Sequence, residues 1–305
     1  MNRPWCYIVP EGVRVYELDG SEALDLLQRI STADVASVRE GKGIATILTN
    51  EKGRVIDVVG AVTGPDGRLL LACAGDRDGR VGRWLERFII MEDVVVRDVT
   101  DRYLQVICYA VDEISHRWSP PLVAGSLRMV PFSIWKNHWS FVVIEARIWK
   151  DVESVLREEG GASVDRTAFD RDRIAAGVPW AGTEISDQRN PLESRLRSLI
   201  SFTKGCYVGQ EVIARLDTYR KVRAGLTRFS GSLPEGAIAP LPIHTSDGTE
   251  AGILSSVGGD TKSQAIALGF VRTHLLKPDL VLNCSGRGEL RPLDTDLDEE
   301  VYRSA

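Results

Sequence analysis

The sequence changes character after residue 222, and this change constrains the fold more than any other feature of the chain. Beyond it, short runs of apolar residues are separated by turn sequences rich in Gly, Pro and Asp. Many short strands joined by such turns are typical of a small β-sandwich or β-barrel. The strand-like runs occupy residues 225–231, 238–243, 251–257 and 265–271. We therefore predict a small C-terminal β-barrel over residues 223–292.

Before residue 222, strand-like and helix-like segments alternate. Residues 14–18 alternate like a strand, and residues 19–30 combine a capping-box pattern with apolar residues at helical spacing. Residues 45–62 predict a β-hairpin, and the apolar stripes in 81–89 and 152–156 predict amphipathic helices. Two such alternations indicate the α+β class with two subdomains.

Length and charge limit the classes of function. The chain has 305 residues, more than one compact core usually holds, so we expect two or three domains. Its net charge of -5 argues against general nucleic-acid binding, which needs a basic face. No apolar run has the length of a membrane span, and residues 1–8 lack a signal-peptide core. We expect a cytoplasmic protein that binds neither nucleic acid nor membranes, and nothing demands more than a monomer.

The cysteines and histidines show no pattern of metal ligands. Five cysteines and four histidines are scattered along the chain, without a Cys-x-x-Cys pair. Zinc ribbons and four-cysteine iron–sulfur sites need clustered ligands. We therefore predict no resident metal.

Residues 204–211, Lys-Gly-Cys-Tyr-Val-Gly-Gln-Glu, form the most informative motif of the chain. Gly209 would free the backbone where a loop becomes a helix, and the following residues predict that helix. A helix N-terminus and the cation of Lys204 would both favour the thiolate of Cys206. The alternative is a small buried cysteine in a tight turn. The flanking Lys, Gly, Gln and Glu residues favour a site, with Cys206 and Lys204 as its catalytic groups.

This motif is similar to the signature of the YgfZ family, which comprises folate-binding proteins of iron–sulfur cluster biogenesis. Those proteins are related in fold to the aminomethyltransferase (T-protein, GcvT-like) of the glycine cleavage system. Further matching stretches lie at residues 28–35, 48–57, 173–184, 190–193 and 251–256.

The resemblance implies a GcvT-like three-domain cloverleaf around a central folate channel. The folate-binding region would span residues 1–222, followed by the barrel and an acidic tail at 293–305. Its two subdomains would comprise residues 1–45 with 150–222, and residues 46–149.

The resemblance also implies tetrahydrofolate, or a one-carbon derivative of it, as the cofactor. Glu193 matches the position where aminomethyltransferases use a glutamate on the pterin ring. Without the resemblance, Glu193 is better explained as an acid capping the chain after Pro191. The anionic glutamate tail of folate would meet a basic residue, and Arg215 is one of several candidates after the motif.

Four more residues are candidates for cofactor binding. Tyr207 and Trp180 have aromatic rings that would stack on the pterin or aminobenzoyl group, although each is equally consistent with a core position. Gln210 would orient Lys204 or cap the helix. Asp57 stands where the transferases carry paired acids, but Val58 follows it, so one acid is missing. Cys206 likewise occupies the position of an acidic residue in those enzymes.

Three functions remain open. The preferred interpretation is a tetrahydrofolate-binding factor that assists assembly or repair of iron–sulfur proteins, with client or assembly proteins as partners. The second is an enzyme, a folate-dependent aminomethyltransferase or demethylase. At the positions of Val58 and Cys206 this chain lacks carboxylates that the transferases carry, which weakens this interpretation without excluding it. The third is a scaffold that binds no folate.

Overall fold

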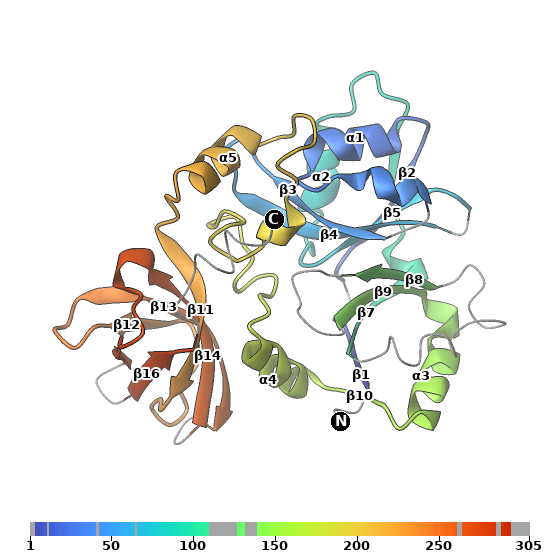
Figure 1. Ribbon diagram of the computed structural model, residues 1–305. Helices are drawn as coiled ribbons and strands as arrows, with labels where there is room; N and C mark the ends of the chain where they lie inside the picture. The colour runs from blue at the N-terminus through green and yellow to red at the C-terminus, as the bar shows by residue number, and fades with distance from the viewer. Residues whose placement is uncertain are drawn as a thin grey trace. The chain divides into compact units, whose positions relative to one another are not determined.

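The computed structural model describes residues 4–10, 12–40, 43–64, 66–109, 127–131, 139–260, 264–284 and 288–293. The chain divides into two compact units (Figure 1). The first contains Met1–Arg166 with Leu199–Gln210, and the second contains Thr167–Ser198 with Glu211–Ala305. None of the helices in the described ranges is long and apolar enough to cross a membrane.

The first unit contains an antiparallel sheet of five strands in the order β3-β4-β5-β2-β6. The predicted hairpin is confirmed, because β3 and β4 pair in antiparallel register around the turn at Asn50. The strands are β2 (Val15–Asp19), β3 (Ile44–Thr49), β4 (Val55–Thr63), β5 (Leu69–Cys73) and β6 (Val95–Asp98). Since β2 pairs with β5, the predicted subdomain boundary at residue 45 falls inside this sheet.

A second sheet of the same unit has the order β10-β1-β7-β9-β8. Its strands are β1 (Trp5–Ile8), β7 (Tyr103–Tyr109), β8 (Leu127–Pro131), β9 (Trp139–Glu145) and β10 (Ala162–Ser163). Apolar residues of β1, β7 and β9 form one buried cluster with helix α3 (Trp149–Glu158). Among its described residues, this unit also contains 3-10 helices at Val35–Glu40, Thr100–Arg102 and Ala146–Ile148.

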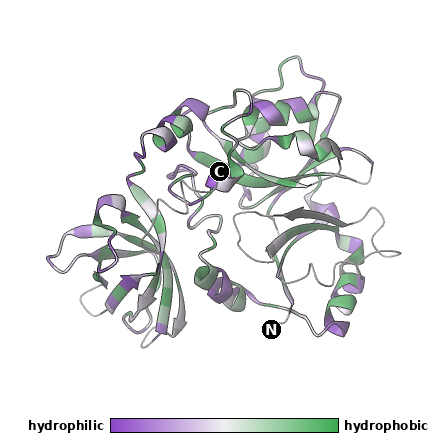
Figure 2. Ribbon diagram, in the orientation of Figure 1, coloured by the Kyte–Doolittle hydropathy of each residue, from purple (hydrophilic) through white to green (hydrophobic). Residues whose placement is uncertain are grey.

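Helices form where apolar residues recur at helical spacing. Helix α1 (Ala23–Ile30) buries Ala23, Leu26, Leu27 and Ile30, which lie on one face. Helix α2 (Arg80–Glu86) buries Val81, Gly82, Trp84 and Leu85. Figure 2 shows hydrophobic and hydrophilic residues alternating around α1 and α3, as expected for helices that cover one side of a sheet.

The second unit contains a closed barrel of six strands in the order β11-β14-β13-β12-β15-β16. Pairing of β11 with β16 closes it, and the apolar side chains of its interior form one core. The strands are β11 (Ala224–Gly231), β12 (Leu241–His244), β13 (Glu250–Asp260), β14 (Gln264–Arg272), β15 (Leu282–Cys284) and β16 (Gly288–Pro292), with a 3-10 helix at Thr273–Leu275. The predicted α+β class and C-terminal barrel are therefore confirmed, while nearly all of the predicted acidic tail lies outside the described residues.

The second unit also contains helices α4 (Arg166–Ala176) and α5 (Gln210–Thr218) and a 3-10 helix at Arg197–Leu199. Each helix shares its first residue with the first unit. The helix predicted after the motif is thus present as α5.

A buried carboxylate, Glu184, joins α4 to the barrel. Arg173 of α4 donates to one of its oxygens at 3.1 Å, and both side chains are almost completely buried. Ser255 and Ser256 of β13 donate to the other oxygen, each at 2.6 Å. The guanidinium of Arg173 also donates to the Ser256 hydroxyl at 2.8 Å. These bonds replace the water that both charges lose on burial.

We expect Glu184→Ala to destabilise the full chain by about 3–5 kcal/mol, because it removes the fully buried one of the two carboxylates, Glu184 and Asp170, that pair with the buried Arg173. Chemical denaturation of the full-length protein measures the loss. Glu211→Ala is the matched control, since Glu211 is an exposed glutamate of α5. It should cost less than about 1 kcal/mol. A loss below 1 kcal/mol for Glu184→Ala would show that the ion pair does not hold α4 to the barrel.

Candidate functional site

The motif loop, residues 199–210, is held between the end of α1 and the end of β3. The N–H of Ser201 donates to the Thr32 carbonyl at 2.9 Å, and the N–H of Val208 donates to the Arg29 carbonyl at 3.3 Å. The Thr49 hydroxyl donates to the Val208 carbonyl at 2.6 Å. Hydrogen bonds to the backbone of Ser201 and Val208 therefore fix the loop on both sides of Cys206.

Lys204 binds backbone carbonyls at the C-terminal end of α1. Its ammonium group donates to the carbonyls of Gln28, Ser31 and Ala33 at 2.7, 2.7 and 2.6 Å. An ammonium group has three N–H donors, so these three bonds use all of them. Burial lowers the pKa of Lys204 to about 8, and the nearby carboxylate of Asp34 opposes this shift. Lys204 thus acts on the position of the loop, and its predicted catalytic role stays a prediction.

Cys206 is exposed at the tip of this loop, whereas Cys6, Cys73, Cys108 and Cys284 are buried. The expectation of a sulfur at the surface therefore agrees with its position, and the alternative of a buried cysteine does not.

The residues after Cys206 turn the chain back toward the core. Tyr207 is buried, and its ring lies 5.3 Å from the Lys204 ammonium nitrogen. Gly209 has a φ of 84°, and a Cβ at this position would lie 2.6 Å from the Asn50 carbonyl oxygen. Only glycine fits this combination of backbone angle and close approach. Gln210 then begins α5, and its N–H donates to the Tyr207 carbonyl at 3.2 Å.

Asp57 is enclosed in the core of the first unit. Its two carboxylate oxygens accept the N–H groups of Val58 at 2.9 Å and Gly75 at 3.1 Å. Burial raises the pKa of Asp57 to about 7, although the two N–H bonds and the charge of Arg80 partly oppose the shift. The carboxyl group therefore exchanges its proton near neutral pH.

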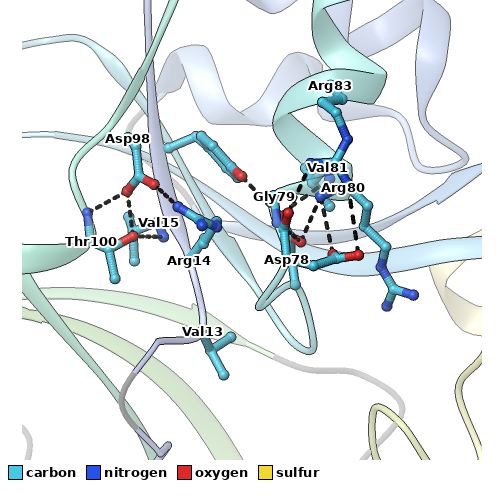
Figure 3. Close-up of polar contacts among 12 residues, drawn as sticks. Val13, Arg14, Val15, Asp78, Gly79, Arg80, Val81, Arg83, Asp98 and Thr100 are labelled. Atoms are coloured by element: carbon cyan, nitrogen blue, oxygen red, sulfur yellow. Dashed lines mark hydrogen bonds and ion pairs between the residues drawn. The ribbon is translucent and has the colours of Figure 1, made fainter.

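Asp76, a carboxylate close to Asp57, organises the start of α2. The N–H groups of Gly79, Arg80 and Val81 donate to Asp76 at 2.9, 2.9 and 3.2 Å. Figure 3 labels these three donor residues at the start of α2. The hydroxyl of Tyr16 donates to Asp76 at 2.8 Å. Sequence reasoning missed Asp76, although an aspartate just before an amphipathic helix is a usual capping signal.

In the second unit, the side chains of Glu193 and Asn190 accept hydrogen bonds from each other's backbone N–H groups. The side-chain oxygen of Asn190 accepts the N–H groups of Leu192 at 2.9 Å and Glu193 at 3.1 Å. One Glu193 carboxylate oxygen accepts the Asn190 N–H at 3.1 Å. The carbonyl of Glu193 accepts the N–H of Leu226 in β11 at 2.9 Å. The capping contact considered for Glu193 is present, and it orients the carboxylate.

The other two candidates of this unit differ in exposure. Trp180 is buried and makes an edge contact with Phe169, with ring centroids 4.8 Å apart, and its backbone N–H donates to the Glu184 carboxylate at 3.0 Å. Arg215 is exposed on α5. The structure thus groups Asp57, Lys204, Cys206, Tyr207 and Gln210 within the first unit, and Trp180, Glu193 and Arg215 within the second.

The described residues contain no group of three or more His, Cys, Asp or Glu side chains arranged to hold a metal ion.

Known sequences that are similar to this chain include a putative transferase and several aminomethyltransferases. Residues 11–108 match the family described as the GCVT N-terminal domain. The Arabidopsis thaliana protein named "Putative transferase At1g60990, chloroplastic" is 29% identical over 277 residues, which are 84% of this chain and 62% of that protein. The chain thus spans less than two thirds of that relative. The aminomethyltransferase of Symbiobacterium thermophilum is 25% identical over 285 residues, covering 84% of this chain and 75% of the relative.

Comparison with solved structures shows a similarity in fold. The crystal structure of the glycine cleavage system aminomethyltransferase T from Bartonella henselae superposes with a TM-score of 0.76 and 13% sequence identity. The match covers 98% of this chain and 87% of that structure. The predicted GcvT-like fold is therefore confirmed.

We expect the buried Asp57 to make the protein less stable as the pH rises. Its pKa is about 7 in the folded chain and about 4 when unfolded, so only the folded state holds the proton between these values. Its contribution to the unfolding free energy is full below pH 4 and falls by up to about 1.4 kcal/mol per pH unit until about pH 7. Urea unfolding at pH 4.5, 6 and 8 should show this slope in the wild type but not in Asp57→Asn.

Asp93→Asn is the matched control for this measurement. Asp93 is an exposed aspartate whose pKa is lowered by the bonds that the backbone N–H and hydroxyl of Ser21 donate to it, so it does not share the raised pKa of Asp57. This variant should keep the slope of the wild type. Equal slopes in the wild type and Asp57→Asn would contradict the assignment.

Proposed function

We propose that this chain is a tetrahydrofolate-binding factor that assists the assembly or repair of iron–sulfur proteins, with Cys206 as its reacting group. The observation that carries the proposal is the exposure of Cys206 on a loop whose other contacts serve to position it. The similarity of residues 204–211 to the YgfZ signature supports the iron–sulfur role. In this proposal the thiol carries out thiol or transient metal chemistry for client or assembly proteins.

The proposal of a folate ligand rests on the aminomethyltransferase fold, the match of residues 11–108 and the chemistry of the donors. The amino-pyrimidine edge of a pterin donates two parallel N–H bonds, and an oriented carboxylate accepts such a pair. Glu193 is oriented by the Asn190 N–H and is only partly buried. Arg215 is exposed and supplies a cation of the kind that the anionic glutamate tail requires.

In this proposal the aromatic candidates, Trp180 and Tyr207, contribute to the folate site without stacking fully on the ligand. Trp180 and Tyr207 are both buried. Trp180 packs on Phe169, and Tyr207 packs beside Lys204. We infer that they shape the polypeptide around the ligand rather than present a full ring face to it.

The second candidate function is a folate-dependent aminomethyltransferase, which the names of several relatives favour. Such an enzyme must stabilise a cationic iminium-like centre with negative charge. In this chain Val58 stands beside Asp57, and the carboxyl group of Asp57 is sealed by backbone N–H groups with a pKa of about 7. A partly protonated, enclosed acid is poorly suited to this task, so we rank the transferase second.

We expect tetrahydrofolate to stabilise the protein against thermal unfolding, by about 2.7 kcal/mol at 100 times the dissociation constant. Glu193→Gln should keep the bond from the Asn190 N–H, because a glutamine oxygen accepts it equally, yet lose the charge. Its affinity should therefore fall by roughly 10- to 100-fold with little change in the melting temperature of the free protein.

Two further results define the test of folate binding. Glu193→Ala should lose both the affinity and some stability, which separates the two tasks of this residue. An unchanged melting temperature of the wild type in tetrahydrofolate would favour the scaffold and contradict the proposal.

We expect Cys206→Ser to keep the fold and the tetrahydrofolate affinity but to lose the cellular function. Activities of iron–sulfur enzymes, measured in extracts of a strain that lacks this protein, should be restored by the wild type and not by the variant. Thr203→Ala is the matched control, since Thr203 is exposed on the same loop. Full rescue by Cys206→Ser would remove the cysteine from the mechanism. Formation of methylene-tetrahydrofolate from an aminomethyl-lipoyl protein by the purified chain would instead establish the transferase.

A further inference from the structure

Strands β1 and β7 place two buried cysteines directly opposite each other. Cys6 and Cys108 are 102 positions apart in the sequence but are partners in the antiparallel register. Their sulfur atoms lie 2.7 Å apart, and neither side chain is exposed to solvent. Both belong to the apolar cluster under α3.

The backbone pairing at this position suits a disulfide bond. The N–H of Val9 donates to the carbonyl of Gln105 at 2.8 Å, and these residues continue the register of β1 and β7. Hydrogen-bonded and non-hydrogen-bonded pairs alternate along an antiparallel ladder, so Cys6 and Cys108, three pairs further on, are a non-hydrogen-bonded pair. Such pairs have Cα atoms about 4.5 Å apart, within the range of about 4.4–6.8 Å found for disulfides. The bond therefore requires rotation of side chains and no movement of the strands.

We propose that Cys6 and Cys108 are an oxidation site at which a peroxide forms a cross-strand disulfide. One thiol, as thiolate, attacks hydrogen peroxide, breaking the O–O bond to give a sulfenic acid and, after protonation, water. The second sulfur attacks the sulfenic sulfur, the S–O bond breaks, and the hydroxyl leaves as a second water. Overall, two thiols and one peroxide give one disulfide and two waters, so the two sulfurs are oxidised and the peroxide oxygens are reduced.

The other cysteines are placed differently. Cys73 lies in β5 of the other sheet, Cys284 lies in the barrel, and Cys206 is exposed on the motif loop. Cys6 and Cys108 are the only two cysteines that lie opposite each other in the strand registers of the described residues. The site is separate from the residues assigned to folate and iron–sulfur chemistry, so the proposal does not depend on that function.

Local opening of β1 gives the peroxide access to the buried pair. The outer side of β1 is covered by β10, which pairs at only two positions, Trp5↔Ala162 and Cys6↔Ser163. Short pairing of this kind opens at lower cost than global unfolding. When β1 closes again, the register brings the second sulfur onto the sulfenic acid, so that the second step is intramolecular.

The disulfide would close a long loop of the chain. Residues 6–108 include α1, α2 and the whole of the β3-β4-β5-β2-β6 sheet. A cross-link over so long a loop removes much of the freedom of the unfolded chain. The oxidised protein should therefore melt several degrees higher than the reduced protein.

The test uses the full-length protein with Cys206→Ser, which prevents cross-linking between chains. After treatment with hydrogen peroxide, the protein is unfolded, alkylated and digested with trypsin without reduction. We expect a linked pair of peptides, 1–14 and 103–117, which separates on reduction. The melting temperature should rise by several degrees after oxidation and return with dithiothreitol.

Single variants separate this pair from general oxidation. Cys6→Ala should show neither the linked peptides nor the reversible rise, and Cys108→Ala should behave in the same way if it folds. Cys284→Ala should keep both signals, since it removes a buried cysteine from the barrel. Alkylation of Cys6 and Cys108 in the peroxide-treated protein would overturn the proposal. An equal rise in melting temperature in Cys6→Ala would overturn it as well.

Discussion

The position of the motif loop depends on the hydrogen bonds that the Lys204 ammonium group donates to three backbone carbonyls. The chain enters this loop at Leu199 after passing through the second unit and leaves again after Gln210. Lys204 binds three carbonyls at the end of α1, where unpaired helix carbonyls and the helix dipole both favour a cation. An apolar side chain would remove these three donors from carbonyls in a partly buried position. One charge thus fixes a segment that has little regular structure of its own.

The buried carboxylates of Glu184 and Asp57 differ in their hydrogen-bond donors, and this difference gives them different roles. Glu184 accepts bonds from Arg173, from two serine hydroxyls, from the Thr183 hydroxyl and from the backbone N–H of Trp180, so its charge is compensated and it joins α4 to the barrel. Asp57 has only the N–H groups of Val58 and Gly75 as direct donors in the described contacts, and burial dominates, so its pKa rises to about 7. The first arrangement is suited to stability, whereas the second is suited to exchanging a proton.

The features that sequence reasoning predicts are those carried by local pattern. The barrel follows from short alternating runs and glycine turns, and the first four of its strands lie near the predicted positions. Strands β15 and β16 escape prediction because Asn283, Glu289 and Arg291 interrupt their apolar residues, so neither segment forms an apolar run like those of the first four strands. The carbonyl partners of Lys204 lie at least 171 positions away, so no local pattern reveals them. The pairing of β2 with β5 and the meeting of Cys6 with Cys108 likewise depend on long-range register.

Most of the characteristic residues of the motif hold the loop in its conformation, whereas Cys206 is exposed on it. Lys204 binds α1, Tyr207 fills the core, and Gly209 permits a left-handed turn against Asn50. Each of these residue types is explained by a contact or a backbone angle. Burial, the common reason for a cysteine in a folded protein, does not apply to Cys206, which is exposed. A thiol without a packing task, on a loop built by its neighbours, is best explained by its reactivity, and this is why the proposed function is centred on Cys206.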